Sequence, residues 1–350
     1  MHAPVSRRAV LLAGASCALD GLVSQRCLAQ TSERPPLPIP TELRADAAGV
    51  VRLDARTGTM LFGGDRRTPT YGINGPFLGP AIRVRRGETV TMHVANNVAE
   101  NITMYWHGLI VPGIVDGGPH QVIKPGKWWQ ADIAIDQPAA TLWFHPHFYP
   151  TTAGLVIKGL AGLLIVDDEE TARLPLPSRW GVDDIPLIIQ DRRFTPDAQF
   201  FDRINAITAT NGYVGDVALV NGAPYPQART ARGWLRLRVL DASNARSYRL
   251  STSDNRSLHV IASDGGLLAS PVELNELLIH AGERFEVMVD ARNGPAFDIV
   301  TLPVAEPIMR LPPFDGPLPL VTIRPDGAEG MDSFPRRWPC CHRCHSSLRR

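Results

Sequence analysis

The residues from Met104 to Asp167 read MYWHGLIVPGIVDGGPHQVIKPGKWWQADIAIDQPAATLWFHPHFYPTTAGLVIKGLAGLLIVD, and the interpretation of the whole chain starts from them. Four of the ten histidines of the chain lie in this stretch, and three of them, His107, His145 and His147, have spacings that suit metal ligation. On an extended strand, residues at i and i+2 point to the same face, so the last two imidazoles can reach one metal ion. Tyr105 shares a face with His107 for the same reason. The spacing therefore predicts a three-histidine metal site on adjoining strands.

Short strand-like runs, separated by glycine and proline, surround this stretch. Pro (31) and Gly (30) are both frequent among the 350 residues, which favours many short strands joined by turns. Residues 50–53 and 59–62 read as the two strands of a hairpin. Residues 89–97 alternate apolar with other side chains, which puts His93 on the solvent side of a strand. We expect residues 43–168 to form an antiparallel β-sandwich.

A second strand-rich unit is expected at residues 186–325, after a polar connector with a short helix at 168–172. In this unit, residues 234–240 alternate apolar side chains with arginine, which predicts a half-buried strand. His259 and His280 fall in different strands without an i, i+2 partner. The second unit is therefore interpreted as structural scaffold.

The composition narrows the class of protein. A net charge of +1 with 44% hydrophobic residues is typical of a globular protein, and the length allows two domains with full cores. Such a balance gives no reason to expect nucleic acid or an anionic membrane surface as a partner.

Both ends of the chain differ from its body. Residues 1–29 resemble a twin-arginine signal peptide, with Arg7 and Arg8 before an apolar stretch that is too short to span a bilayer. Export to the periplasm follows from that interpretation. The body contains no cysteine, so neither a disulfide nor a thiolate ligand is available there; the five cysteines are Cys17, Cys27, Cys340, Cys341 and Cys344.

The tail at residues 326–350 changes abruptly in composition. Cys341 and Cys344 have the spacing of a soft-metal site that would suit Cu(I). The alternative, which we prefer, is an out-of-frame end of the coding sequence.

Motifs in both units resemble those of the multicopper oxidases, most closely the bacterial periplasmic copper efflux (cuprous) oxidases. The resemblance extends over about residues 43–325. It implies two consecutive cupredoxin-like Greek-key β-sandwiches, with the first (43–168) holding half of a trinuclear copper site and the second (186–325) a scaffold. The matching motifs are Trp106-His107-Gly108-Leu109, Val115-Asp116-Gly117-Gly118-Pro119, Trp143-Phe144-His145-Pro146-His147, Asn221-Gly222-Ala223 and Gly282-Glu283-Arg284-Phe285-Glu286-Val287.

The resemblance also assigns roles to individual residues. His107, His145 and His147 match type 3 copper ligands, and Asp116 matches an acidic residue that resembles a proton relay. From its own sequence context, Asp116 is equally a turn residue that hydrogen-bonds its own backbone. Tyr105 stands where the family has a type 2 histidine, and a phenol pKa of about 10 makes it a poor substitute.

Two functions follow from this resemblance. The first is a copper-dependent oxidoreductase that oxidises Cu(I) or phenol-like substrates, reduces dioxygen to water and serves copper tolerance, here in a truncated form without the third domain and its type 1 copper. The second is a non-catalytic envelope protein that keeps a remnant three-histidine copper or zinc site. Some relatives of this fold have lost copper ligands and serve structural roles. An oligomer that covers the face left by the missing domain is compatible with both.

Overall fold

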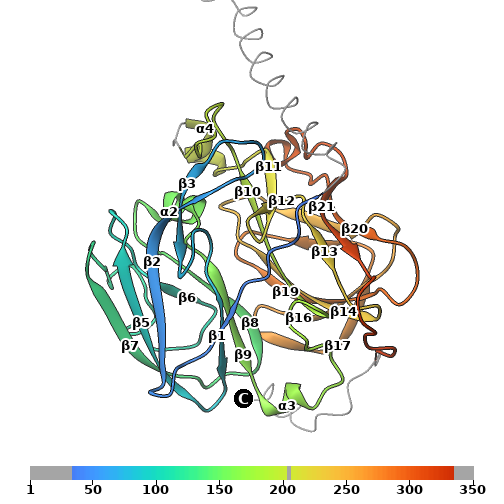
Figure 1. Ribbon diagram of the computed structural model, residues 1–350, viewed down its shortest axis with the longest axis horizontal. Coiled ribbons are helices and arrows are strands. Elements are labelled where there is room, and N and C mark those ends of the chain that lie inside the picture. Colours follow the sequence, from blue (N-terminus) through green and yellow to red (C-terminus); the bar gives the residue numbers. More distant parts are fainter. Residues whose placement is uncertain (1–33, 203–205, 335–350) are drawn as a thin grey trace, which may run out of the picture.

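The computed structural model describes residues 34–202 and 206–334. The expected signal peptide at 1–29, the five cysteines and most of the tail lie outside these residues. Two β-sandwiches stand side by side (Figure 1), so the predicted all-β fold class is confirmed. None of the described helices has the length and apolar character needed to cross a membrane.

The first sandwich packs a five-stranded sheet against a four-stranded sheet. Its core is filled by the alternate apolar residues of both sheets, such as Val51 and Leu53 from one and Ile82 and Phe144 from the other. The first sheet has the order β1 (Glu42–Leu43), β4 (Ala81–Arg85), β9 (Gly162–Asp167), β8 (Ala140–His145) and β6 (Tyr105–His107); the second has the order β3 (Thr68–Ile73), β2 (Val50–Met60), β5 (Thr89–Asn97) and β7 (Trp128–Ala134).

Strand pairing in this unit differs from the expected antiparallel pattern. β1 with β4, β4 with β9 and β2 with β5 are parallel pairs. Parallel neighbours need a long crossover, and the chain supplies it by passing to the other sheet between them. The first sandwich is therefore mixed.

The hairpin expected within residues 50–62 is wrong, because β2 is one continuous strand. Its first part pairs with β5 and its last part with β3, so every segment has a hydrogen-bonding partner without a turn. Gly58 marks a close approach instead. A Cβ atom there would lie 2.4 Å from the carbonyl oxygen of Pro76.

The second sandwich packs a seven-stranded sheet against a five-stranded sheet. One large apolar cluster, which includes Leu187, Leu237 and Val287, fills the space between them. The first sheet has the order β12 (Ala223–Pro224), β11 (Val217–Val220), β10 (Asp184–Arg192), β14 (Trp234–Asp241), β19 (Arg284–Asp290), β16 (Leu258–Ser263) and β17 (Gly266–Leu274); the second has the order β13 (Gln227–Arg229), β21 (Leu318–Arg324), β20 (Phe297–Leu302), β15 (Tyr248–Thr252) and β18 (Leu277–Ile279).

Short helices connect the strands. The helix predicted at 168–172 is confirmed as α3 (Glu169–Ala172), whose N-cap Asp168 accepts a hydrogen bond from the Thr171 amide. α2 (Thr152–Lys158) was not predicted, because seven residues are too few to show a helical period. The remaining helices are α4 (Ala206–Asn211) and the 3₁₀-helix η1 (Pro307–Arg310).

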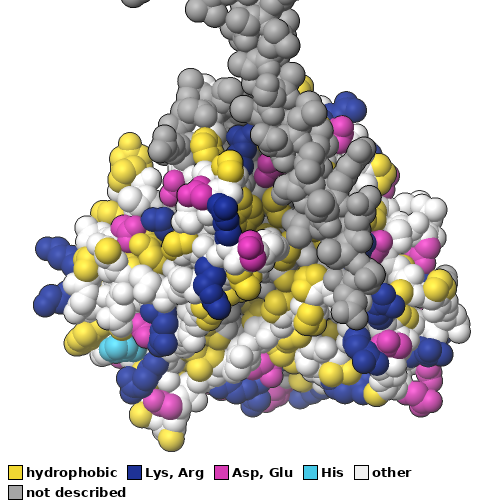
Figure 2. Space-filling model, turned by 45° about the horizontal axis from the view of Figure 1, so that its top comes forward, with side chains coloured by type: hydrophobic (Ala, Val, Ile, Leu, Met, Phe, Trp, Pro, Cys, Tyr) yellow, Lys and Arg dark blue, Asp and Glu magenta, His cyan; other side chains and the backbone are white. Residues whose placement is uncertain are grey.

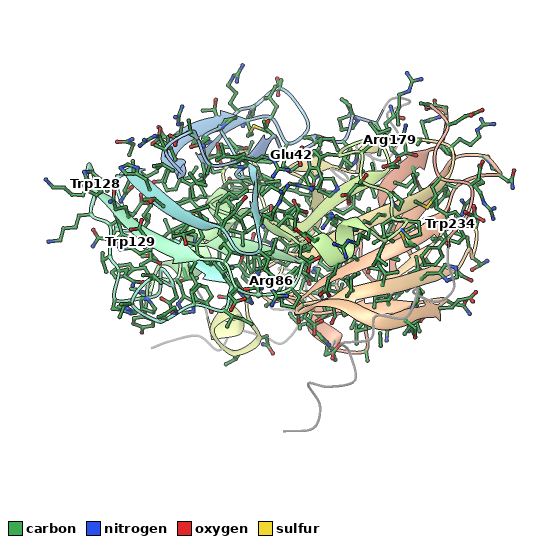
Figure 3. All side chains as sticks on the ribbon, turned by 90° about the horizontal axis from the view of Figure 1, so that it is seen from below. Glu42, Arg86, Trp128, Trp129, Arg179 and Trp234 are labelled. Atoms are coloured by element: carbon green, nitrogen blue, oxygen red, sulfur yellow. The ribbon has the colours of Figure 1, made fainter. Side chains whose placement is uncertain are left out.

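The two sandwiches meet through an apolar cluster and buried ion pairs. Trp143 and Leu163 of the first pack with Ile188 and Leu240 of the second. Figure 3 shows Glu42 near this junction, with Trp128 and Trp129 far out on the first sandwich and Trp234 in the second.

We expected β14 to be buried on one face only, but both of its faces are buried. Arg236 and Arg238 are only 6% and 3% exposed, since their face of the strand is covered by the first sandwich. Elsewhere the charges are mixed: on the face in Figure 2, acidic and basic side chains are interspersed.

Candidate metal centre

The register between β6 and β8 brings the predicted site residues together. Tyr105 lies opposite His145, and His107 lies opposite Trp143. These four side chains share one face of the sheet, while Trp106 and Phe144 point into the core and are fully buried. The expectation that Tyr105 shares a face with His107 thus agrees with the strand geometry.

His107 and His145 contact each other directly. The distance between His107 Nδ1 and His145 Nε2 is 3.2 Å, and His145 Nδ1 lies 2.8 Å from the carbonyl oxygen of Pro146. A carbonyl oxygen only accepts, so Nδ1 of His145 carries the proton and its Nε2 is the acceptor. His107 Nδ1–H therefore donates to His145, and the lone pair of that Nε2 is occupied.

Tyr105 lies against all three imidazoles. Its ring centroid is 5.7 Å from that of His107, 5.8 Å from His145 and 5.3 Å from His147, in edge-on arrangements. The phenol is thus part of one group of rings, the histidine cluster, which we define as Tyr105, His107, His145 and His147. His147 follows the end of β8, and its backbone N–H donates to Thr103 Oγ1 at 2.7 Å.

Burial keeps two of the imidazoles neutral. It lowers the pKa of His107 to about 4, and the nearby Arg284 guanidinium adds to this effect. Burial also lowers the pKa of His145 to about 3, although the hydrogen bond to Pro146 opposes the shift. Both rings are therefore uncharged near neutral pH, which is the protonation state that ligates metals.

Asp116 lies in a turn that holds β6 in place. Its Oδ1 accepts a hydrogen bond of 2.8 Å from the Gly118 amide, and its carbonyl oxygen accepts one of 3.0 Å from the Trp106 amide. The side chain therefore satisfies its own turn, as one of the two sequence interpretations expected.

The arrangement does not fit a metal ion held by three protein ligands. Across residues 34–202 and 206–334, no three His, Cys, Asp or Glu side chains are placed to hold one ion together. The hydrogen bond between the two rings occupies Nδ1 of His107 and Nε2 of His145. The Tyr105 ring lies edge-on to all three imidazoles.

Comparison with known proteins identifies the fold family. Residues 54–171 and 200–307 each match a family model described as multicopper oxidase. The chain belongs to the multicopper oxidase family. The two sandwiches are accordingly the cupredoxin-like domains of that family, as the resemblance implied.

Some relatives of this chain are named as cell division proteins, and others are named as oxidases. The cell division protein FtsP of Salmonella typhimurium is 38% identical over 340 residues, which cover 95% of this chain and 72% of that protein. FtsP of Escherichia coli K12 is 37% identical, and the match again covers 95% of this chain and 72% of that protein.

The similar solved structures are named as oxidases. The laccase-like multicopper oxidase CueO from an Ochrobactrum species, described as having oxidase activity towards lignin model compounds, has a TM-score of 0.81 and 39% identity; the match covers 87% of this chain and 67% of that one. McoA from Aquifex aeolicus has a TM-score of 0.78 and 30% identity, and the match covers 87% of this chain and 68% of that one.

Two residues beside the histidine cluster were missed from the sequence. Trp143 stacks on His145 with ring centroids 4.0 Å apart, and alternation from His145 was enough to find it. Arg284 comes from the second sandwich, where its Nε donates to the carbonyl oxygen of Thr141. No local pattern connects Arg284 with the histidines of this multicopper oxidase homologue.

Replacing Gly117 by alanine is expected to destabilise the protein by at least about 4 kcal/mol. Gly117 has φ +75°, and a Cβ atom would lie 1.6 Å from the carbonyl oxygen of Met104, directly before β6. The urea midpoint of unfolding measures the effect. Gly113→Ala in the same loop is the matched control, since the nearest atom to its Cβ is 3.9 Å away; equal midpoints for the two variants would contradict the prediction.

Proposed function

We propose that this chain is a non-catalytic multicopper oxidase homologue that acts in cell division in the bacterial envelope. The cell-division role rests on the FtsP relatives, which match 95% of the chain. The envelope location rests on the twin-arginine pattern at Arg7 and Arg8, which favours export to the periplasm.

The position of Tyr105 is the observation that carries the proposal. Tyr105 stands where the family resemblance places a type 2 histidine, and imidazole is the side chain that suits copper. Its ring centroid lies 5.3 to 5.8 Å from the centroids of all three imidazoles. His107 and His145 are hydrogen-bonded to each other, so one nitrogen of each ring already has a partner without a metal.

A copper-dependent oxidoreductase is the competing proposal. In that case His107, His145 and His147 hold copper as type 3 ligands, Asp116 relays protons, and Cu(I) or a phenol is oxidised at the expense of dioxygen. Three imidazoles on one face support it, as does the described oxidase activity of the CueO structure. A remnant copper or zinc site without turnover is the intermediate case.

We expect the purified protein to retain far less than one equivalent of metal and to oxidise neither Cu(I) nor a methoxyphenol above the buffer rate. The protein is dialysed against Cu²⁺ and, separately, Zn²⁺, and bound metal is measured by mass spectrometry. An oxidase such as the Ochrobactrum CueO serves as the positive control. One firmly held equivalent that His145→Ala abolishes establishes the remnant site instead, and oxygen consumption with phenol establishes the oxidase.

A genetic experiment tests the cell-division role separately. The chain is expressed in Escherichia coli that lacks FtsP, and division is scored under conditions where the deletion strain divides abnormally. We expect Tyr105→Phe and His145→Ala to restore division as well as the wild type does. Restoration that depends on His145 and on added copper would overturn the non-catalytic proposal.

A further inference from the structure

A cavity of about 410 Å³ lies between the two sandwiches, against α2. Its walls include Lys158 and Glu100 from the first sandwich and Tyr213 and Asn244 from the second, and none of the residues of the histidine cluster. In Figure 1, α4 lies at the top of the molecule and α2 lies below it, and both helices contribute residues to the lining of the cavity. Small-molecule sites have volumes of about 300–1,000 Å³ and prefer domain interfaces, so the size and position suit a ligand.

Gly154 keeps this cavity open. It lies within α2 and lines the cavity, and a Cβ atom built on it would meet nothing within 4 Å. Glycine is a poor residue inside a helix, and neither a close neighbour nor a left-handed backbone requires it at this position. The space beside Gly154 is therefore available to a ligand. The neighbouring Ala153, Leu155 and Ile157 make the α2 wall largely apolar.

Asn244 offers an acceptor at one end. Its Nδ2 donates to the carbonyl oxygen of Ala153 at 3.1 Å. Its Oδ1 is buried and has no partner among the described residues. A buried acceptor without a donor is unfavourable, and a ligand N–H group satisfies it.

Lys158 offers a cation at the other end. Its ammonium group donates to Glu100 Oε1 at 2.9 Å and lies over the Tyr71 ring. An ammonium group has three N–H donors, so it can hold Glu100 and a ligand carboxylate together. Ala153 and Lys158 are five residues apart, which corresponds to about 7.5 Å along a helix.

We propose that this cavity binds a dipeptide-sized zwitterion with an apolar side chain. Its amino group would donate to Asn244 Oδ1, its side chain would pack on the α2 wall over Gly154, and its carboxylate would bind Lys158. Two extended residues span about 7 Å, which is close to the rise along α2 from Ala153, whose carbonyl group accepts from Asn244, to Lys158. This site is independent of the proposed role of the chain in division and of the histidine cluster.

Binding of alanyl-leucine to the whole protein tests the proposal, measured by calorimetry and by saturation-transfer NMR. We expect wild type to bind, and Gly154→Leu to weaken binding at least tenfold by filling the cavity. The melting temperature of Gly154→Leu should be equal to or above that of wild type, because leucine is the better helix former. Gly154→Ala is the matched control and should bind within about threefold of wild type, since one methyl group leaves most of the cavity open.

The two ends are tested separately. Lys158→Met should weaken binding of alanyl-leucine but leave binding of its carboxamide unchanged, and Asn244→Leu should weaken binding of both. Absence of binding by wild type at millimolar peptide, or undiminished binding by Gly154→Leu, overturns the proposal. Equal weakening of acid and amide by Lys158→Met also overturns it, because the lysine then acts only through the structure.

Discussion

Replacing Glu286 by alanine is expected to destabilise the folded protein by about 3–5 kcal/mol, since it leaves a buried arginine without its counter-charge. Glu286 Oε1 accepts a hydrogen bond of 3.0 Å from Arg238 and one of 2.6 Å from Thr141, and Oε2 accepts one of 2.8 Å from Arg236. Arg238 is paired in addition with Asp184, at 2.7 and 2.9 Å. Two acids thus balance two arginines, and the removal of one acid leaves a net positive charge in the junction.

Urea and thermal unfolding measure this loss, and a surface pair provides the control. Glu169 and Arg173 are joined at 3.3 Å, but their side chains are 85% and 76% exposed. Glu169→Ala should therefore change stability by less than about 1 kcal/mol. Similar losses for the two variants would show that the buried network contributes no more than an exposed pair.

The pH dependence of the same residue gives a second readout. Burial alone would raise the pKa of Glu286, but Arg236 and Arg238 outweigh it and lower the pKa from 4.5 to about 2. The unfolded chain then binds the proton more readily, so the stabilisation is complete above pH 4.5 and is lost as the pH falls through about 2. We expect the difference in stability between wild type and Glu286→Gln to shrink over that interval.

The network around Glu286 also shows where sequence patterns stop being informative. Alternation along residues 234–240 assigned the arginines and the apolar residues to opposite faces of β14, and that assignment agrees with the structure. It did not reveal that the arginine face is covered by Thr141 of the first sandwich. A strand period tells which side chains share a face, whereas the partner that covers the face comes from a distant part of the chain.

Prediction from sequence spacing is limited in the same way for the histidine cluster. Spacing predicted that Tyr105 shares a face with His107, and the resemblance linked His107 with the pair at 145 and 147. The hydrogen bond between His107 and His145 depends on the register of β6 against β8, because a shift of one residue would place the rings on opposite faces. Local spacing therefore predicts that the three histidines can meet, whereas the contact between His107 and His145 follows from the strand pairing.

Replacing Tyr105 by histidine is expected to tighten Cu²⁺ binding by at least about 100-fold, since even the loss of outer partners of a metal site typically changes affinity 10- to 100-fold. Position 105 lies opposite His145, and its side chain already contacts the other three rings of the cluster. A neutral imidazole placed there adds a ligand of the kind that copper prefers, in the space that the phenol occupies. Copper content after dialysis and the electron paramagnetic resonance spectrum of bound Cu²⁺ measure the gain.

Two companion variants separate ligation from mere opening of space. Tyr105→Phe keeps the ring but removes the hydroxyl group, so it should bind no more copper than wild type. Adding His145→Ala to Tyr105→His should abolish the gain, because the new imidazole then lacks the ring opposite it in the sheet. If Tyr105→Phe gains copper as Tyr105→His does, the hydroxyl group is the obstacle and not the missing ligand. If neither variant gains copper while both stay folded, the bond between His107 and His145 closes the cluster to metal without any help from Tyr105.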